Sequence, residues 1–203
     1  MSWQDQVTWV AVGIELVSLI YYIRSIVKGP TRPHPISWAG WTAIGAVGAW
    51  AARSGGAGLA FYVAAAFVVV TGSIFVVSLL PGYGHETDET SITDRPVLVL
   101  GVLLIGLRIL NLGAPWIHAS LAVAGDSCFT WFTIRKAMQH PDTEPLWPWL
   151  GAVVAASLGI VVLGAHNYTA MAFPVYLLAA NVGIAGATVI GRVKKSKGHK
   201  HKG

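Results

Sequence analysis

The sequence predicts an all-α, polytopic membrane protein with seven transmembrane helices, arranged as two parallel three-helix repeats joined by a single inverter helix. Three observations support this prediction: an apolar composition, a series of long apolar runs, and a segment that occurs twice. Hydrophobic residues make up 54% of the 203 residues and charged residues only 11%, about half the charged fraction of soluble domains. Such a composition is typical of chains that fold in a bilayer.

Seven apolar runs follow one another, each near the roughly 17 to 25 residues that a helix needs to cross a bilayer. We expect helices at Val7–Val27, Ile36–Ala52, Ala57–Leu80, Pro96–Leu112, Trp116–Ile134, Leu146–Ala165 and Tyr168–Gly191. Aromatic residues lie near the ends of several runs, where an amphipathic ring favours the headgroup layer. We predict this interfacial position for Tyr22, Trp38, Trp41, Trp147 and Trp149.

The segment Asp126–Gly151 is a second copy of Glu15–Gly40, because adding 111 to a residue number in the first copy gives its partner. The offset pairs Glu15 with Asp126, Arg24 with Arg135, Pro30 with Pro141, Trp38 with Trp149 and Gly40 with Gly151. Similarity at a fixed offset indicates a repeated structural unit. The sequence therefore predicts that the first three helices and the last three helices share one architecture.

This offset leaves the fourth run, Pro96–Leu112, without a partner. Three crossings reverse the direction of the chain, so one extra crossing gives both repeats the same orientation, related by an axis along the membrane normal. We therefore expect four parts: residues 1–80 as the first bundle, 81–114 as a polar loop and linker helix, 115–191 as the second bundle, and 192–203 as a basic cytoplasmic tail.

Small residues recur on the second helix of each predicted repeat. Gly40, Gly45 and Gly48 correspond to Gly151, Ala156 and Gly159. Small residues allow helix backbones to approach closely in membranes. We expect close contacts with neighbouring helices at these positions.

Basic residues are unevenly distributed. Six of the fourteen Lys and Arg residues lie in the last twelve positions. With the N-terminus outside, only Arg53 and Arg108 lie on the outer side, and the other twelve lie at inner ends and loops. Short basic segments are retained in the cytoplasm, so we expect an external N-terminus and a cytoplasmic C-terminus. The basic tail is expected to meet anionic lipid rather than nucleic acid.

Two proline-containing segments follow the first helix of each repeat, Lys28–Trp38 and Thr133–Glu144. Together with the three-plus-one-plus-three order, they resemble the SWEET and PQ-loop (MtN3/saliva) superfamily of membrane transporters, and most of all bacterial PQ-loop-like membrane proteins of unassigned function. The resemblance covers roughly residues 7–191. It implies transport of a small solute, such as a sugar, across a bacterial plasma membrane. The Pro-Gln dipeptide of the family is absent, and so are hinge prolines from Val7–Val27 and Trp116–Ile134.

Glu15 and Asp126 lie midway along the first and fifth predicted helices, at equivalent repeat positions. An ionised carboxylate in a membrane is costly unless it faces the bundle interior, water or a partner. One interpretation is a pair that binds protons or contacts substrate along a central path. The alternative is a structural hydrogen bond between helices.

Arg108 is the other charge inside a predicted helix. It is expected either to pair with one of the two acids or to extend its side chain to the outer headgroups.

The resemblance to SWEET proteins implies that Asn181, on the third helix of its unit, hydrogen-bonds substrate. Its counterpart in the first repeat is Val70, and the neighbouring Thr71 offers a hydroxyl. Trp50 is a candidate for stacking on a sugar. The simpler alternatives are an interhelical hydrogen bond for Asn181 and a packing role for Trp50.

The sequence contains no nucleotide-binding loop, nucleophile triad or metalloprotease motif. His85, Glu86, Asp88 and Glu89 have metal-binding side chains, but a solvated loop is the simpler interpretation. We therefore expect no enzyme activity, cofactor or metal. The predicted function is transport of a small polar solute, with proton coupling as one mode, and the alternative is a non-transporting receptor or scaffold. A homo-oligomer is compatible with the sequence.

Overall fold

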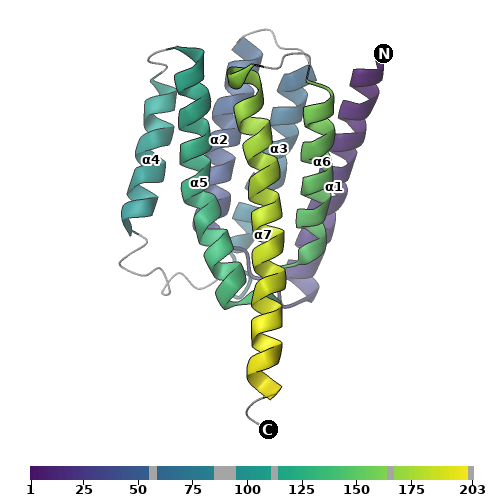
Figure 1. The fold of residues 1–203 in the computed structure, drawn as a ribbon, viewed down its shortest axis with the longest axis vertical. Coiled ribbons are helices and arrows are strands. Elements are labelled where there is room, and N and C mark those ends of the chain that lie inside the picture. Colours follow the sequence, from purple (N-terminus) through teal and green to yellow (C-terminus); the bar gives the residue numbers. More distant parts are fainter. Residues whose placement is uncertain (55–58, 85–94, 111–113, 164–166, 201–203) are drawn as a thin grey trace.

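The computed structural model describes residues 1–54, 59–84, 95–110, 114–163 and 167–200, and within these ranges the regular structure is helical. The helices are α1 (Trp3–Lys28), α2 (Pro35–Ser54), α3 (Leu59–Ser78), α4 (Arg95–Ile109), α5 (Pro115–Gln139), a 3-10 helix η2 (Pro141–Thr143), α6 (Leu146–Val161) and α7 (Tyr168–Lys200). The α-helices run side by side, and the two chain termini lie at opposite ends of the bundle (Figure 1). We call these the N-terminal end and the C-terminal end.

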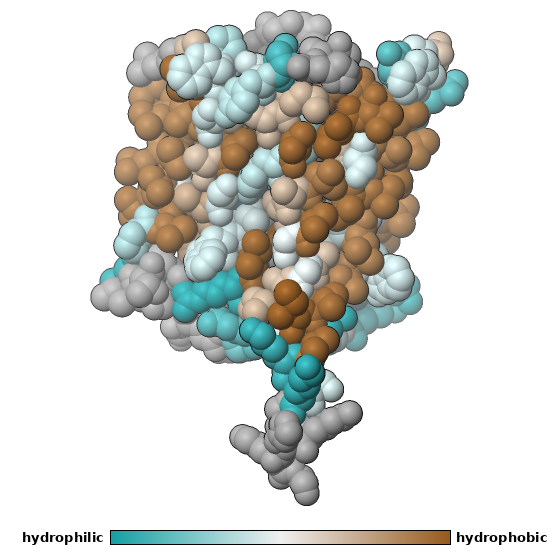
Figure 2. Space-filling model, in the orientation of Figure 1, coloured by the Kyte–Doolittle hydropathy of each residue, from teal (hydrophilic) through white to brown (hydrophobic). Residues whose placement is uncertain are grey.

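The helices are compatible with an integral membrane protein. Within the described residues, Trp3–Lys28, Phe61–Ser78 and Tyr168–Lys197 are long and apolar enough to cross a bilayer, and Leu146–Val161 is a shorter apolar helix. Apolar side chains cover much of the face shown in Figure 2 between the two ends. Leu103 on α4, for example, has 58% of its surface exposed. Such a surface is suited to acyl chains rather than to water.

The helices pack in two groups that we name the first group (α1–α3) and the second group (α5–α7). In the first group α3 lies against both α1 and α2, and in the second group α7 lies against both α5 and α6. Between the groups, α1 packs on α6 and α2 packs on α5. Helix α4 lies at the side of the bundle, against α5 and α2 (Figure 1).

Glycine allows two close contacts between the two groups. A Cβ atom at Gly40 would overlap the ring of Phe129, and a Cβ atom at Gly151 would overlap the hydroxyl of Ser18. The two contacts are equivalent under the 111-residue offset, because Gly151 is the counterpart of Gly40 and Phe129 is the counterpart of Ser18. The prediction of close contacts is wrong for Gly48 and Gly159, where an added Cβ would have nothing within 4 Å.

Aromatic side chains fill the space where the groups meet. Trp38, Trp41 and Trp149 are each 6% exposed, and Tyr22 is 2% exposed. Ring centroids are 5.0 Å apart for Trp38 and Trp41, 5.9 Å for Trp41 and Trp149, and 5.1 Å for Tyr22 and Trp38. The prediction of interfacial positions is wrong for these four residues, since packing rings against one another excludes lipid and fills the core. Trp147 is 68% exposed.

Two helices extend by five residues or more beyond their predicted C-terminal ends. α5 continues past Ile134 to Gln139, and α7 continues past Gly191 to Lys200, so the start of the predicted tail is helical. Arg and Lys favour helices. Basic residues just beyond the predicted helix ends, such as Lys136 and Arg192, interact with other elements of the fold, so the helices continue through them. The Arg192 guanidinium, for example, donates to the carbonyl of Glu144 at 2.8 Å.

We predict opposite effects for two alanine substitutions on α2. Gly40→Ala should destabilise the protein by roughly 1–3 kcal/mol, because its methyl group overlaps Phe129 in a packed core. Gly48→Ala should stabilise the helix by about 1 kcal/mol or less, since Ala favours helices over Gly and the site is open. Thermal unfolding of both purified variants in detergent tests this. Equal stability of the two variants would contradict the close packing of α2 on α5.

Candidate functional site

Two clusters of polar side chains, most of them buried, lie inside the bundle. The first, the Asp126 cluster, consists of Asp126, Thr130 and Tyr176 between α5 and α7. The second, the Glu144 cluster, consists of Tyr22, Lys136, Glu144 and Trp149 near the C-terminal end. The sequence predicted a role for Asp126 but not for the Glu144 cluster.

The Asp126 cluster arises from a polar face on α5. Asp126, Thr130 and Thr133 recur at the three- and four-residue spacing that places side chains on one face of a helix. All three are at most 5% exposed. α5 packs against α7 and α2, so this face is directed into the bundle.

The two carboxylate oxygens of Asp126 differ in their hydrogen bonds. The hydroxyls of Thr130 and Tyr176 donate to Oδ2, at 3.0 and 2.8 Å. Trp41, on α2, also interacts with this carboxylate. Within the described residues, neither Asp126 Oδ1 nor Thr133 Oγ1, two turns further along the same face, has a hydrogen-bond partner. Buried polar atoms are nearly always satisfied in folded proteins, so these two atoms are candidates for contact with a bound molecule.

Glu15 has different surroundings. It lies in the middle of α1 and is only half-buried, whereas Asp126 is 1% exposed. The counterparts of Thr130 and Tyr176 under the 111-residue offset are Leu19 and Ala65, which have no hydroxyl groups. The two acids occupy equivalent repeat positions, but only Asp126 lies in a polar cluster.

Arg108 pairs with neither acid. It lies near the end of α4, and its Nη1 donates to the carbonyl of His118, close to the start of α5, at 3.0 Å. Its Nε is buried without a partner in the described part of the chain. Arg108 thus connects α4 to α5 near the N-terminal end.

The other three candidate residues lie in different environments. Thr71 is 2% exposed, and its hydroxyl donates to the carbonyl of Phe67 in its own helix at 2.9 Å. Asn181 is half-buried on α7. Trp50 is 64% exposed, near the end of α2, so the structure places it outside the bundle interior. His85, Glu86, Asp88 and Glu89 lie outside the described residues.

The Glu144 cluster connects the two groups of helices. Glu144 is 1% exposed, and its Oε1 accepts hydrogen bonds from Tyr22 Oη at 2.9 Å and Trp149 Nε1 at 2.8 Å. Its Oε2 forms an ion pair with Lys136, which is 2% exposed and also donates to the carbonyl of Thr143 at 3.1 Å. One carboxylate therefore holds side chains from α1, α5 and α6.

Further contacts at the C-terminal end join the same segments. The backbone N–H of Arg32 donates to the carbonyl of Thr143 at 3.0 Å, and the hydroxyl of Ser37 donates to the carbonyl of Phe129 at 2.8 Å. The ring of His34 stacks on Phe132, with centroids 5.3 Å apart and planes at 5°. The link between α1 and α2 is thus fixed to α5 and η2.

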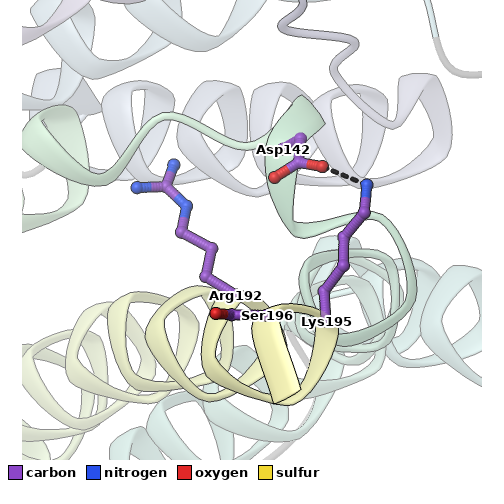
Figure 3. A pocket seen from close by; sticks show the side chains of 4 residues that line it. All are labelled: Asp142, Arg192, Lys195 and Ser196. Carbon is purple, nitrogen blue, oxygen red and sulfur yellow. Dashed lines mark hydrogen bonds and ion pairs between the residues drawn. The ribbon is translucent and has the colours of Figure 1, made fainter. Parts of the chain in front are cut away.

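A shallow pocket of about 300 Å³ lies outside this end, lined by Asp142, Arg192, Lys195 and Ser196. Figure 3 shows Lys195 and Asp142 pointing toward each other, with the ion pair as a dashed line. Both residues are more than half exposed. The Arg192 guanidinium is directed to the carbonyls of Pro141 and Glu144. The residues that line this pocket come from α7 and η2, which pack against each other.

One feature of the sequence could have indicated the Glu144 cluster: two opposite charges beside a turn that contains prolines. Glu144 lies between Pro141 and Pro145, eight residues after Lys136, at a turn that returns the chain to the bundle. A charge of each sign beside a proline-bounded turn is also typical of a solvated loop. Only the fold shows that Tyr22, 122 residues away in sequence, reaches this carboxylate.

We predict a large difference between a buried and an exposed ion pair. Glu144→Gln should destabilise the protein by about 3–5 kcal/mol, because it leaves Lys136 charged and buried without a counterion. Asp142→Asn, which removes the exposed pair with Lys195, should change stability by about 1 kcal/mol or less. Unfolding of both variants in detergent tests this. Similar losses in the two variants would show that the Glu144 cluster is accessible to water.

Comparison with known proteins assigns no family to this chain. No family model matches its sequence, no curated protein matches it, and no solved structure matches its fold.

Proposed function

We propose that this protein is an integral membrane transporter of SWEET or PQ-loop type that moves a small polar solute between two three-helix units. The observation that carries the proposal is the buried polar face of α5. Asp126 Oδ1 and Thr133 Oγ1 are both buried and unsatisfied within the described residues. In a bilayer such groups are expensive, so their presence inside an apolar bundle favours contact with a transported molecule.

The packing of the helices supports a three-plus-one-plus-three arrangement. The contacts between the two groups are symmetric. The first helix of each group packs on the second helix of the other, because α1 packs on α6 and α5 packs on α2. The reciprocal contacts of Gly40 with Phe129 and of Gly151 with Ser18 obey the same symmetry. α4 then serves as the linker that gives both units one orientation, related by an axis along the membrane normal.

The position of the Asp126 cluster supports a path between the units. Its side chains come from α5 and α7 in the second group, and Trp41 approaches from α2 in the first group. A solute at this place contacts both units, so a relative movement of the units changes its surroundings. Asn181, on α7, and Glu15, on α1, are further candidates for contact in a more open state.

The C-terminal end supports a closed state on one side. The Glu144 cluster, the aromatic rings of Trp38 and Trp149, and the contact of Arg32 with Thr143 hold the two groups together there. We propose that this is the cytoplasmic side, in keeping with the basic residues near it. Transport then requires these contacts to separate.

The alternative function is a non-transporting receptor or scaffold. The observation that favours it is the packed aromatic core between the groups, in which Tyr22, Trp38, Trp41 and Trp149 are all buried. A core of this kind stabilises one state. The two functions differ in whether solute crosses the membrane.

We predict solute uptake that depends on Asp126. Purified protein in liposomes should take up at least one of labelled glucose, glycine and ethanolamine faster than protein-free liposomes. Asp126→Asn should reduce that uptake by roughly tenfold or more, because hydrogen bonds to a charged group are among the strongest in a binding site. Asn181→Ala tests the family-like contact in the same assay.

The exposed pair provides the matched control, since Asp142→Asn alters a carboxylate far from the Asp126 cluster and should transport like the unmodified protein. Uptake of none of the three solutes would favour the receptor or scaffold. Uptake that is unchanged by a pH gradient, and by Glu15→Gln combined with Asp126→Asn, would exclude proton coupling through these acids.

A further inference from the structure

We infer that the site around Asp126 takes a small organic cation, such as a protonated amine, in preference to a neutral or anionic solute. This inference rests on the proposed function and specifies its substrate class. It follows from the balance of charges inside the bundle, from the groups around Asp126, and from the polar surface that leads to them.

The groups that interact with Asp126 are the hydroxyls of Thr130 and Tyr176 and the side chain of Trp41, all uncharged, so they stabilise a carboxylate without cancelling its charge. Thr130 and Tyr176 both donate to Oδ2, and Oδ1 is buried and without a hydrogen-bond partner within the described residues. A buried charge in a low-dielectric interior is costly unless it is paired. A ligand that brings a positive charge and N–H donors to Oδ1 supplies both missing interactions.

The cations of neighbouring elements are engaged elsewhere. Lys136, two to three turns along α5, forms an ion pair with Glu144. Arg108, on α4, donates to the carbonyl of His118. Arg192, on α7, donates to the carbonyls of Pro141 and Glu144. The other charge midway along a helix of either group is Glu15, which is acidic, so the middle of the bundle is suited to a positive and not to a negative ligand.

Aromatic rings near Asp126 favour the same class of ligand. Trp41 interacts with the carboxylate, and Tyr176 donates to it. Phe173 lies beside Tyr176, with ring centroids 6.1 Å apart. The faces of Trp and Tyr attract a desolvated cation. A neutral polyol could bond to Asp126 Oδ1 and Thr133 Oγ1, which have no partners within the described residues, but it would leave the charge of Asp126 unpaired.

A line of hydroxyl groups leads from the N-terminal end toward this site. Ser120 and Tyr168 are joined by a hydrogen bond of 2.8 Å between the first turns of α5 and α7. Ser127 is exposed on the next turns of α5, and Tyr176 follows on α7. Figure 2 shows a pale stripe of weakly polar side chains along the seam between these helices, among apolar side chains. The seam offers a polar approach to Asp126.

Three probes of similar size test the inference: ethanolammonium, ethylene glycol and glycolate, which differ mainly in charge. Each is titrated into the purified full-length protein in lipid nanodiscs, and thermal unfolding is recorded. A ligand of the native state raises the unfolding temperature with concentration. We expect a saturating rise with ethanolammonium and none with ethylene glycol or glycolate.

Variants show where the cation binds. Asp126→Asn should weaken ethanolammonium binding by roughly tenfold or more. Tyr176→Phe removes one hydrogen-bond donor to Asp126 and keeps the charge of the carboxylate. It should therefore change the affinity for ethanolammonium, and an unchanged affinity would place the cation elsewhere if Asp126→Asn does not fold. Asp142→Asn, at the exposed pair near the C-terminal end, should bind ethanolammonium like the unmodified protein.

Several outcomes would overturn the inference. The first is binding of ethylene glycol or glycolate that depends on Asp126. The second is ethanolammonium binding that persists in Asp126→Asn or is lost in Asp142→Asn, because the cation would then bind elsewhere. The third is that no probe changes the unfolding temperature and only pH does, which would assign a proton to Asp126. Binding of ethanolammonium without uptake of solute into liposomes would instead overturn the transport function and leave the cation site in place.

Discussion

The structure depends on the neutralisation of one buried carboxylate, that of Glu144. A charge in the interior of a membrane protein is stable only when opposite charge and hydrogen-bond donors surround it. Here the partners come from α1, α5 and α6: Tyr22, Lys136 and Trp149. Because each partner belongs to a different helix, the requirement for pairing fixes how the two groups meet at the C-terminal end. It also explains why α5 continues beyond its apolar run, since Lys136 has to reach the carboxylate.

Several packing positions match under the 111-residue offset, but the surroundings of the two acids do not. Gly40 and Gly151 make equivalent close contacts, and Trp38 and Trp149 are equally buried. Glu15 and Asp126 are also counterparts, but the hydroxyls that bind Asp126 have become Leu19 and Ala65 in the first group. Packing positions tolerate little change because interiors are dense, whereas a binding site needs only one set of ligands. A single site between two similar units is consistent with this division.

The two clusters make opposite use of the same low-dielectric interior. Around Glu144 the charges are balanced and nearly every donor has an acceptor, so the cluster rigidifies one end of the bundle. Around Asp126 the balance is incomplete, since Oδ1 and Thr133 Oγ1 are left without partners in the described residues. Satisfied networks are typical of structural roles, and unsatisfied ones are typical of places where another molecule binds. The contrast gives Glu144 a structural role and supports the proposal of a ligand at Asp126.

The sequence by itself determined the all-helical, membrane-compatible class, the approximate positions of the helices, and an acid at Asp126 that faces the bundle interior, because these follow from apolar length and from the cost of a charge in an apolar helix. Only the tertiary structure decided which helices meet, that Tyr22, Trp38, Trp41 and Trp149 are core residues, that Trp50 lies outside the interior, and that Lys136 and Glu144 form a buried pair. An aromatic ring near a helix end and a charge near a turn are equally suited to the membrane interface and to a buried contact. Which of the two environments a residue has depends on its contact partner. Tyr22 and Glu144 are partners although they lie 122 residues apart in the chain, so local sequence cannot reveal the contact.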